Sequence, residues 1–341
     1  MKKQLIVAYL LFLNFGCGLY AQTYYVDAQQ GDDLNEGSSD APFQTLEHAV
    51  SRANTQTGND PIVIKMKPGI YLLKDKVNVN PVKVEGKDIR FIIEAEIMPD
   101  DEDWSPAAMP VIQSISANNS TTQFPHATGI LVASSHVTIR GLKFLGNANP
   151  QVKYYYPISK EDPELSDMVV SQCYFIGDKE SSKIQGGIWA HGRDNVVSHC
   201  IFYECRNGVL FFNNVDGFVI EHSIIYGAYE SAFWFGPKDY EFTFKNNIIA
   251  HNANFLVGPE QLKYSSVFSN SIIANNSGFV AYWSAEGVKP FSKPAIVLKD
   301  TRTAGRVQLL TNEGVEHEQR HLHLAAGSIG ENLKAGIFTK D

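Results

Sequence analysis

The sequence is poor in cysteine, and this is the first constraint on its fold. It contains four cysteines in 341 residues, with none of the paired spacings that are typical of a zinc finger. So low a count excludes a small domain that depends on a framework of disulfides. We expect Cys173, Cys200 and Cys205 to be buried thiols. A disulfide between Cys173 and Cys200 is the alternative, because the repeats described below place these two residues side by side.

Positive charge is also scarce. The chain has 29 Lys and Arg residues against 37 Asp and Glu residues, which gives a net charge of −8. Nucleic acids and anionic membrane surfaces are themselves negatively charged, so a protein of this charge is a poor partner for either. We therefore expect no nucleic-acid partner.

Long apolar runs are nearly absent, with one exception at the start of the chain. Lys2 and Lys3 precede an apolar run over residues 5–15, and small residues follow up to Ala21. This pattern predicts a signal peptide over residues 1–21, because the run is shorter than the roughly 20 residues that span a bilayer. Lipidation at Cys17 is a less favoured alternative. We expect a secreted or periplasmic protein, with attachment to the cell surface as a variant and no transmembrane segment. Loss of the two lysines would move the net charge from −8 to −10.

The remaining sequence is dominated by a repeat. Six segments share an alternating apolar strand, a polar residue and a second apolar pair, and their last residues are 31, 27, 23, 24 and 24 positions apart. This period, with β-branched residues at alternate positions, predicts a coil of short strands, or parallel β-helix, rather than a helical solenoid. The segments are 137–144, 168–175, 195–202, 218–225, 242–249 and 266–273.

A second strand follows within each of the later repeats. Alternation predicts that one set of side chains fills the core, namely Ile188, Val209, Phe233, Phe255 and Phe279. The next residue of each strand should then point outward, which gives Trp189, Leu210, Trp234, Leu256 and Val280. A row of large apolar residues on an outer face is usually covered or used for binding.

Polar residues share one position at the end of the first strand of each repeat. They are Gln172, His199, His222, Asn246 and Asn270. Stacked amides and imidazoles can satisfy one another and the backbone, so this pattern predicts an internal polar ladder. We therefore assign His199 and His222 a structural role.

The two ends of the chain and two long segments fall outside the repeat. Residues 42–54 have apolar side chains at helical spacing and predict a helix that caps the N-terminal end of the coil within residues 22–60. The coil itself should span residues 61–284, and residues 285–341 should form a C-terminal cap. Two segments are expected to leave the coil as insertions, residues 95–126 and residues 147–166.

Several motifs resemble those of the pectate-lyase-like superfamily of secreted proteins. They are TYYVD at 23–27 with Gly31, Asp32, Asn35 and Gly37, PFQT at 42–45, KPGIY at 67–71, and the later KNNIIA at 245–250 and SNSIIA at 269–274. The resemblance covers most of the chain after the leader and implies a right-handed parallel β-helix. It also implies activity on acidic or complex polysaccharides. No catalytic motif of a lyase or hydrolase subfamily is matched, so the resemblance assigns no residue a role.

Placement on the coil suggests a candidate site. Residues just past the second strand should form a column beside Trp189 and Trp234, whose rings could stack on sugars. For β-elimination at a uronic acid, Arg193 could neutralise the carboxylate and Lys238 or His191 could act as the base. For hydrolysis, Asp239 and Glu260 are the best pair of carboxylates, with Glu230 as a substitute. The column also includes Asn213, Asn214 and Lys263, and Tyr282 completes the predicted substrate-binding set.

The sequence therefore predicts a carbohydrate-active protein, with a polysaccharide lyase favoured. A glycoside hydrolase on the same scaffold is the alternative, and a non-catalytic glycan-binding or surface-structural protein is the second. We expect a monomer with a polysaccharide or oligosaccharide partner and no cofactor. Calcium is a weaker variant that would use the acidic residues 32–33 or 100–103.

Overall fold

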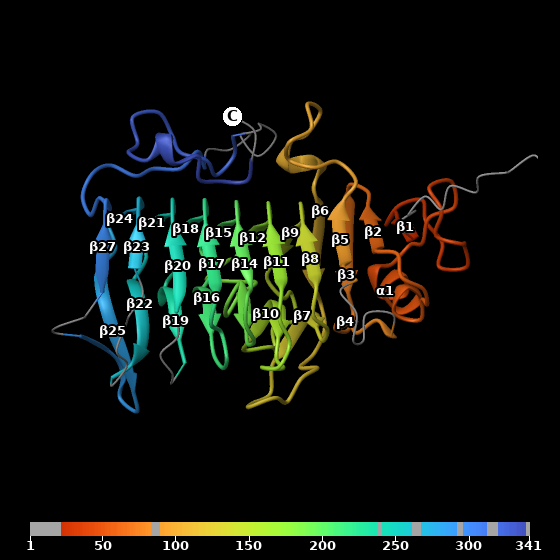
Figure 1. The fold of residues 1–341 in the computed structure, drawn as a ribbon, viewed down its shortest axis with the longest axis horizontal. Helices are drawn as coiled ribbons and strands as arrows, with labels where there is room; N and C mark the ends of the chain where they lie inside the picture. The colour runs from red at the N-terminus through yellow and green to blue at the C-terminus, as the bar shows by residue number, and fades with distance from the viewer. Residues whose placement is uncertain are drawn as a thin grey trace, which may run out of the picture.

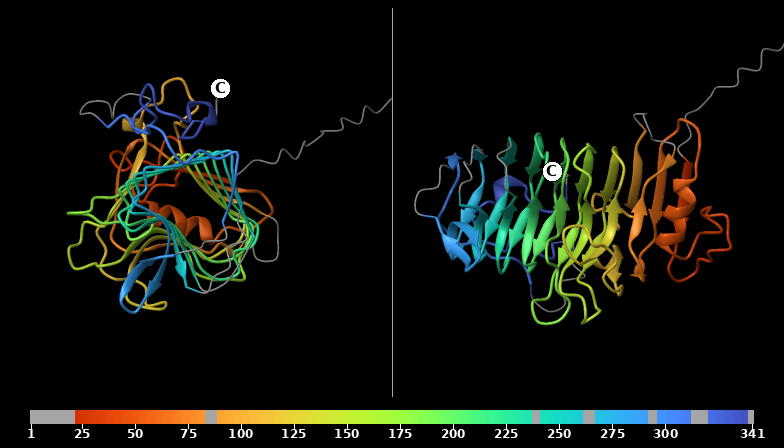
Figure 2. Two further views of the ribbon diagram at one scale, coloured as in Figure 1. Left: turned by 90° about the vertical axis from the view of Figure 1, so that its left-hand side faces the viewer. Right: turned by 90° about the horizontal axis from the view of Figure 1, so that it is seen from below.

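The computed structural model describes residues 22–82, 89–236, 241–260, 267–291, 296–311 and 320–338. The predicted signal peptide lies outside these residues. Most of the described chain winds into a coil with three parallel sheets, so that each full turn adds one strand to each sheet (Figures 1 and 2). The β-helix predicted from the repeat is therefore confirmed. No helix in the described part of the chain has the length and apolar character needed to cross a membrane.

The first sheet contains ten of the described strands. In spatial order they are β1 (Gln22–Val26), β2 (Ile62–Met66), β5 (Phe91–Ala95), β8 (Val137–Arg140), β11 (Met168–Ser171), β14 (Val196–Ser198), β17 (Phe218–Glu221), β20 (Phe242–Lys245), β23 (Val267–Ser269) and β27 (Val297–Lys299). All of them pair in parallel and in register, for example Val170 with Val197 and Val197 with Ile220.

The second sheet contains eight described strands, which follow the first sheet around each turn. They are β3 (Gly69–Leu73), β6 (Pro110–Ser114), β9 (Lys143–Leu145), β12 (Tyr174–Ile176), β15 (Ile201–Tyr203), β18 (Ile224–Tyr226), β21 (Ile248–Ala250) and β24 (Ile272–Ala274).

The third sheet contains nine described strands and closes each turn. They are β4 (Val77–Val79), β7 (Ala127–Val132), β10 (Tyr155–Lys160), β13 (Ile188–Ala190), β16 (Asn207–Phe211), β19 (Ser231–Phe235), β22 (Asn254–Pro259), β25 (Gly278–Ser284) and β26 (Gly287–Pro290). Only β26 is antiparallel, and it folds back on β25.

The core lies inside the coil because inward side chains of one rung stack on those of the next. Ile139, Val170, Val197 and Ile220 are all fully buried and in register. Neighbouring strands are about 4.8 Å apart, so each inward side chain is covered by the equivalent side chain of the next rung. The alternation read from the sequence is confirmed for these rungs.

The predicted N-terminal helix is present as α1 (Leu46–Asn54), and it lies at one end of the coil (Figure 2). Thr45 is its N-cap, and the Thr45 hydroxyl accepts a hydrogen bond from the backbone N–H of His48. Leu46, Ala49 and Val50 face the core and are buried. The helix therefore covers apolar residues that would otherwise be exposed at the open end.

Both predicted insertions contribute a strand to the coil, which corrects their assignment. Strand β6 lies within residues 95–126 and pairs with β3 and β9. Strand β10 lies within residues 147–166 and pairs with β7 and β13. Only the residues around these strands leave the coil, including a short 3₁₀ helix η2 (Pro106–Ala108).

The C-terminal residues lie along the side of the coil and not across its end. Leu322, Leu324 and Leu333 form a second hydrophobic cluster with Ile224 and Ile248, which point outward from the second sheet. The cluster also includes the 3₁₀ helix η4 (Glu331–Leu333). This segment therefore covers the outer face of the second sheet (Figure 1).

The predicted polar ladder exists, but it is not internal. All five of its residues have a left-handed backbone conformation, with φ between 44° and 58°. This turn directs their side chains away from the core, where His199 stacks on His222 and Asn246 donates to His222. The inward ladder is one position later, where Ser223 and Asn247 bond to neighbouring rungs and Cys173 and Cys200 are free thiols.

Candidate functional site

The outward row on the third sheet is continuous but unequally exposed. Trp189 pairs with Leu210, Leu210 with Trp234, and Trp234 with Val257. Trp189 is fully buried and Leu210 is 4% exposed, whereas Trp234 is partly exposed. The row is therefore divided into a covered part and an open part.

Trp189 belongs to a small separate hydrophobic cluster and not to an open surface. Its ring lies 4.8 Å from that of Tyr156, 5.3 Å from Phe212 and 6.1 Å from Phe124. Phe124 comes from the segment before β7, which folds over the third sheet. The prediction that Trp189 binds substrate is therefore wrong, because aromatic side chains from distant parts of the chain cover it.

Trp234 lies in an open groove of about 510 Å³. Its ring stacks on Trp283 at 5.9 Å with an angle of 9° between the planes, and on Phe212 at 5.3 Å. Trp283 is 40% exposed. Phe124, Tyr154 and Tyr156 also line the groove, so its floor and walls are largely aromatic.

Trp283 occupies the position in the groove that was predicted for Tyr282. The cause is a one-residue shift in register, because Phe233 pairs with Leu256 and Leu256 with Val280. Leu256 and Val280 are therefore in the core, and Phe279 is 39% exposed, which reverses their predicted orientations. The same alternation directs Tyr282 away from the groove.

One end of the groove is polar and basic. The Arg206 guanidinium bonds to Glu230 through Nε at 3.0 Å and through Nη2 at 3.1 Å, and its Nη1 donates to Gln185 at 3.3 Å. Asn207 donates to the same carboxylate at 2.7 Å. Glu230, the predicted substitute carboxylate, is therefore at the groove but already paired.

A second cavity of about 450 Å³ continues from this polar end. It shares Gln185, Arg206, Glu230 and Val288 with the aromatic groove. Lys153, Lys183, Tyr229 and Asn254 complete its lining. The described lining therefore has three cationic side chains and one carboxylate, although the protein as a whole is acidic.

The predicted ionisable column does not form one site. His191 is 3% exposed, and burial lowers its pKa to about 4, so the imidazole is neutral near pH 7. It stacks on Phe212 at 5.3 Å, while Arg193 is exposed on the following turn. Glu260 is exposed beyond the end of β22. These three residues do not line either cavity.

Other members of the column have structural roles or fall outside the described chain. Asn214 has φ +57° and donates to the carbonyl of Pro163 at 2.7 Å. Lys238, Asp239 and Lys263 lie outside the described residues, so their predicted roles stay predictions.

The fold described above matches a known family. Residues 112–290, a little more than half of the chain, match the family model for the right handed beta helix region. The chain belongs to this right-handed β-helix family. No curated protein matches the sequence.

Solved structures share the β-helix fold at low sequence identity. Pectate lyase Pel9A aligns with a TM-score of 0.56 and 13% identity over 92% of this chain and 91% of that chain. A rhamnogalacturonan lyase gives 0.52 and 15% over 82% and 73%. The pectin methylesterase from Aspergillus niger gives 0.51 and 10% over 93% and 96%. At such identities the likeness shows a pectate-lyase-like fold alone.

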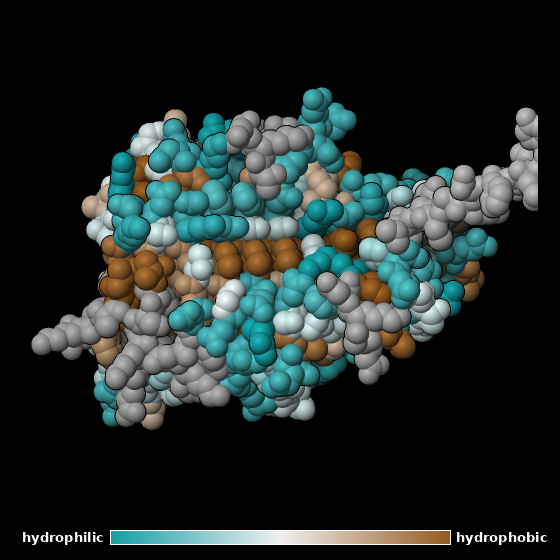
Figure 3. Space-filling model, in the orientation of Figure 1, coloured by the Kyte–Doolittle hydropathy of each residue, from teal (hydrophilic) through white to brown (hydrophobic). Residues whose placement is uncertain are grey.

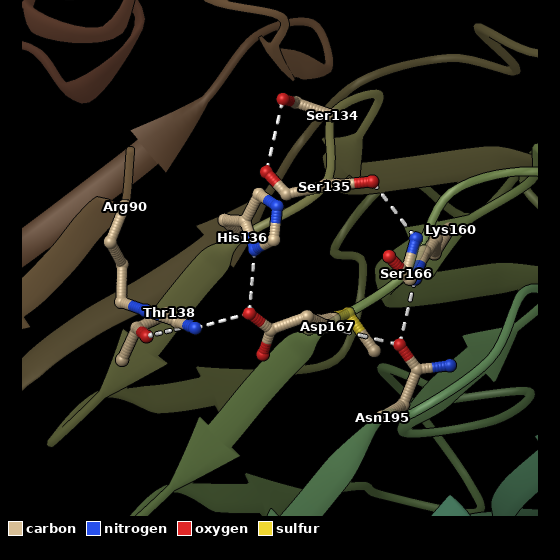
Figure 4. A network of polar contacts seen from close by, with 10 residues as sticks. Arg90, Ser134, Ser135, His136, Thr138, Lys160, Ser166, Asp167 and Asn195 are labelled. Atoms are coloured by element: carbon tan, nitrogen blue, oxygen red, sulfur yellow. Dashed lines mark hydrogen bonds and ion pairs between the residues drawn. The ribbon is translucent and has the colours of Figure 1, made fainter. Parts of the chain in front are cut away.

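The β-helix contains a buried lysine, Lys160, that was not predicted from the sequence. Lys160 is fully buried, and its Nζ donates to Asn195 Oδ1 at 2.8 Å (Figure 4). Burial lowers the pKa of Lys160 to about 7, although Asp167 and Asp194 act in the opposite direction. Lys160 lies in a segment predicted as an insertion, so its inward orientation was not predicted from the sequence. With no exposed surface, its amine is part of the scaffold.

The acidic clusters considered for calcium bind the backbone instead. Asp33 accepts hydrogen bonds from the N–H groups of Gln44 and Thr45, both at 2.9 Å. Asp101 accepts from the N–H of Met98 at 2.8 Å. Within the described residues no group of three His, Cys, Asp or Glu side chains is placed to hold a metal ion. Calcium binding at these residues therefore stays a prediction.

Proposed function

We propose that this β-helix protein binds a polysaccharide in the aromatic groove and cleaves it by β-elimination at a uronic acid. The observation that carries the proposal is the continuity of the two cavities, which join an aromatic surface to a basic end through Arg206 and Glu230. The similar solved structures include a pectate lyase, a rhamnogalacturonan lyase and a pectin methylesterase, which supports carbohydrate chemistry in general.

The groove suits a chain of acidic sugars. The exposed parts of the Trp234 and Trp283 rings can pack against the apolar faces of sugar rings. Lys153, Lys183 and Arg206 exceed the single carboxylate of Glu230 and favour a negatively charged residue at that end. An acidic sugar would thus be held by stacking on one side and by charge on the other.

β-Elimination requires a cation near the sugar carboxylate and a base for the adjacent ring proton. In this groove Arg206 and one lysine replace Arg193 as the source of positive charge, and the other lysine is the candidate base. Hydrolysis would instead need two carboxylates roughly 5–9.5 Å apart. The described lining supplies only Glu230.

A non-catalytic glycan-binding protein is the second candidate. The observation in its favour is the Arg206–Glu230 ion pair, in which each charge is already neutralised by the other. A groove of this kind can hold a sugar without changing it.

One experiment separates these functions. The purified protein is incubated with a panel of acidic and neutral polysaccharides at pH 7 to 10, while absorbance near 235 nm and reducing ends are followed. New absorbance indicates a lyase, and reducing ends without it indicate a hydrolase. Binding in an affinity gel without either signal supports the second candidate and contradicts cleavage.

Variants locate the site. We expect Lys183→Gln and Lys153→Gln to reduce the signal on acidic polysaccharides. The matched control is Lys74→Gln, because Lys74 is exposed at the N-terminal end of the coil, away from the groove. Equal loss in all three variants would contradict the assignment of the groove.

A further inference from the structure

The outer face of the first sheet carries a straight row of mainly β-branched residues. Strand register places one such residue on each rung, so the row runs across the strands along the coil. Its members are Val63, Ile92, Thr138, Val169, Val196, Val219, Thr243, Val267 and Val297.

Most of this row is exposed or half-buried, whereas Val63 and Thr138 are each only 8% exposed. Figure 3 shows a hydrophobic stripe across the front face, interrupted by paler residues. Val267 is 41% and Val297 is 54% exposed. Val169, Val196 and Val219 belong to none of the three hydrophobic clusters, although the second and third sheets both have apolar cover on their outer faces. An exposed apolar stripe of this length marks a candidate interaction surface.

A polar row runs beside the apolar row, two residues further along each strand. Arg140 Nε donates to Glu94 at 2.7 Å, and Lys245 pairs with Glu221 at 2.8 Å. Two uncharged serines separate these pairs. In order, the row is Lys65, Glu94, Arg140, Ser171, Ser198, Glu221, Lys245, Ser269 and Lys299.

The charges of the polar row match those of the same row read in the opposite direction. If the row of a second copy faces it in reverse, with the centre between Ser171 and Ser198, Arg140 of one copy lies opposite Glu221 of the other. Glu94 then lies opposite Lys245, and no charged residue of the row meets a like charge. The same reversal places Val169 opposite Val196 in the apolar row.

We propose that this face binds a second copy of the chain to form a symmetric dimer, in place of the monomer expected from the sequence. The two-fold axis lies between β11 and β14, parallel to the strands, so that the two coils pack side by side and run in opposite directions. Such an interface uses the same residues from both copies. It covers the apolar row and places the opposite charges of the polar row together.

The available area is sufficient for such a dimer. Ten strands spaced at about 4.8 Å give a face about 45 Å long, and two outward residues per strand with their side chains give a width of about 15 Å. Each copy would then bury about 700 Å², close to the roughly 800 Å² per partner of a standard interface.

The first test is sedimentation of the purified protein over a range of concentrations. We expect a reversible monomer–dimer equilibrium that reaches the dimer in the micromolar range. Val196→Glu would place two like charges beside the axis and should abolish the dimer. The control is Leu34→Glu, since Leu34 is 93% exposed on the N-terminal loop, away from this face. Circular dichroism checks that each variant is folded.

Charge reversal then tests the register. Glu221→Arg faces Arg140 of the partner subunit, and Arg140→Glu faces Glu221 of the partner subunit. Each change affects two symmetric contacts, so each variant alone should dimerise roughly tenfold more weakly. An equal mixture of the two variants restores opposite charges at both contacts and should dimerise again.

These two experiments have three outcomes that would contradict the dimer. A wild-type protein that stays monomeric over the whole range overturns the proposal. So does a mixture that sediments like its separate components, or a Val196→Glu variant that dimerises like the wild type. None of these results bears on the groove, because the dimer face and the groove belong to different sheets.

Discussion

Lys160 is a buried lysine whose removal should change how stability depends on pH. Lys160→Met keeps the length of the side chain and removes the amine. Asn195 Oδ1, which accepts from Lys160, also accepts from the backbone N–H of Met168 at 3.1 Å, so it keeps one partner in the variant. The substitution therefore removes a buried ionisable group without leaving the amide oxygen unsatisfied.

The expected magnitude follows from the pKa. Burial lowers the pKa of Lys160 from 10.5 to about 7. Between these values the unfolded state binds more protons than the folded state, so the stability of the wild type rises with pH. At about 1.4 kcal/mol per pKa unit, the penalty is about 4 to 5 kcal/mol below pH 7 and disappears near pH 10.5.

The measurement is urea unfolding of the wild type and Lys160→Met at pH 7 and at pH 9.5. We expect the free energy of unfolding of the wild type to gain about 3 kcal/mol relative to the variant between these two values. All other titrating groups are common to both proteins and cancel in the difference. Lys74→Met, at an exposed lysine, should show no such relative gain. Parallel pH profiles for the wild type and Lys160→Met would refute the reasoning.

Four further predictions concern stability, the groove and the thiols. Trp189→Ala should lower the free energy of unfolding by about 3 to 5 kcal/mol, because it empties a buried cluster, whereas Trp234→Ala should mainly weaken glycan binding, about tenfold by affinity electrophoresis. Burial raises the pKa of Cys200 well above its usual value, so Ellman's reagent should find no reactive thiol there until urea unfolds the protein. Asn246 has φ +58°, so Asn246→Gly should be more stable than Asn246→Ala by about 1 kcal/mol in thermal unfolding.

The rungs of the coil could be predicted because their determinants are local. The strands are three to seven residues long and alternate locally, and the spacing of 23 or 24 residues between later repeats fixes the stacking. The polar residue at the first turn was also visible. Its direction was not, because φ near +50° at His199 and Asn246 turns the side chain outward, and alternation assumes a strand that continues without a turn.

The groove could be predicted only in part, because exposure depends on distant residues. Trp189 and Trp234 occupy the same outward row, and nothing in their own repeats distinguishes them. Phe124 and Tyr156 cover Trp189, whereas Trp234 is partly exposed and stacks on Phe212 and Trp283.

A one-residue change of strand register explains why Tyr282 was predicted at the groove in place of Trp283. One residue of slip at β22 sends every later side chain of that strand pair to the opposite face. It therefore brings Trp283 over Trp234 and takes Tyr282 away from the groove. Since both residues are aromatic and adjacent, the sequence predicted a ring at this place correctly but assigned it to the wrong residue. Substitution of each in turn is thus a direct test of the register: loss of glycan binding in Trp283→Ala but not in Tyr282→Ala is the outcome that the slipped pairing requires.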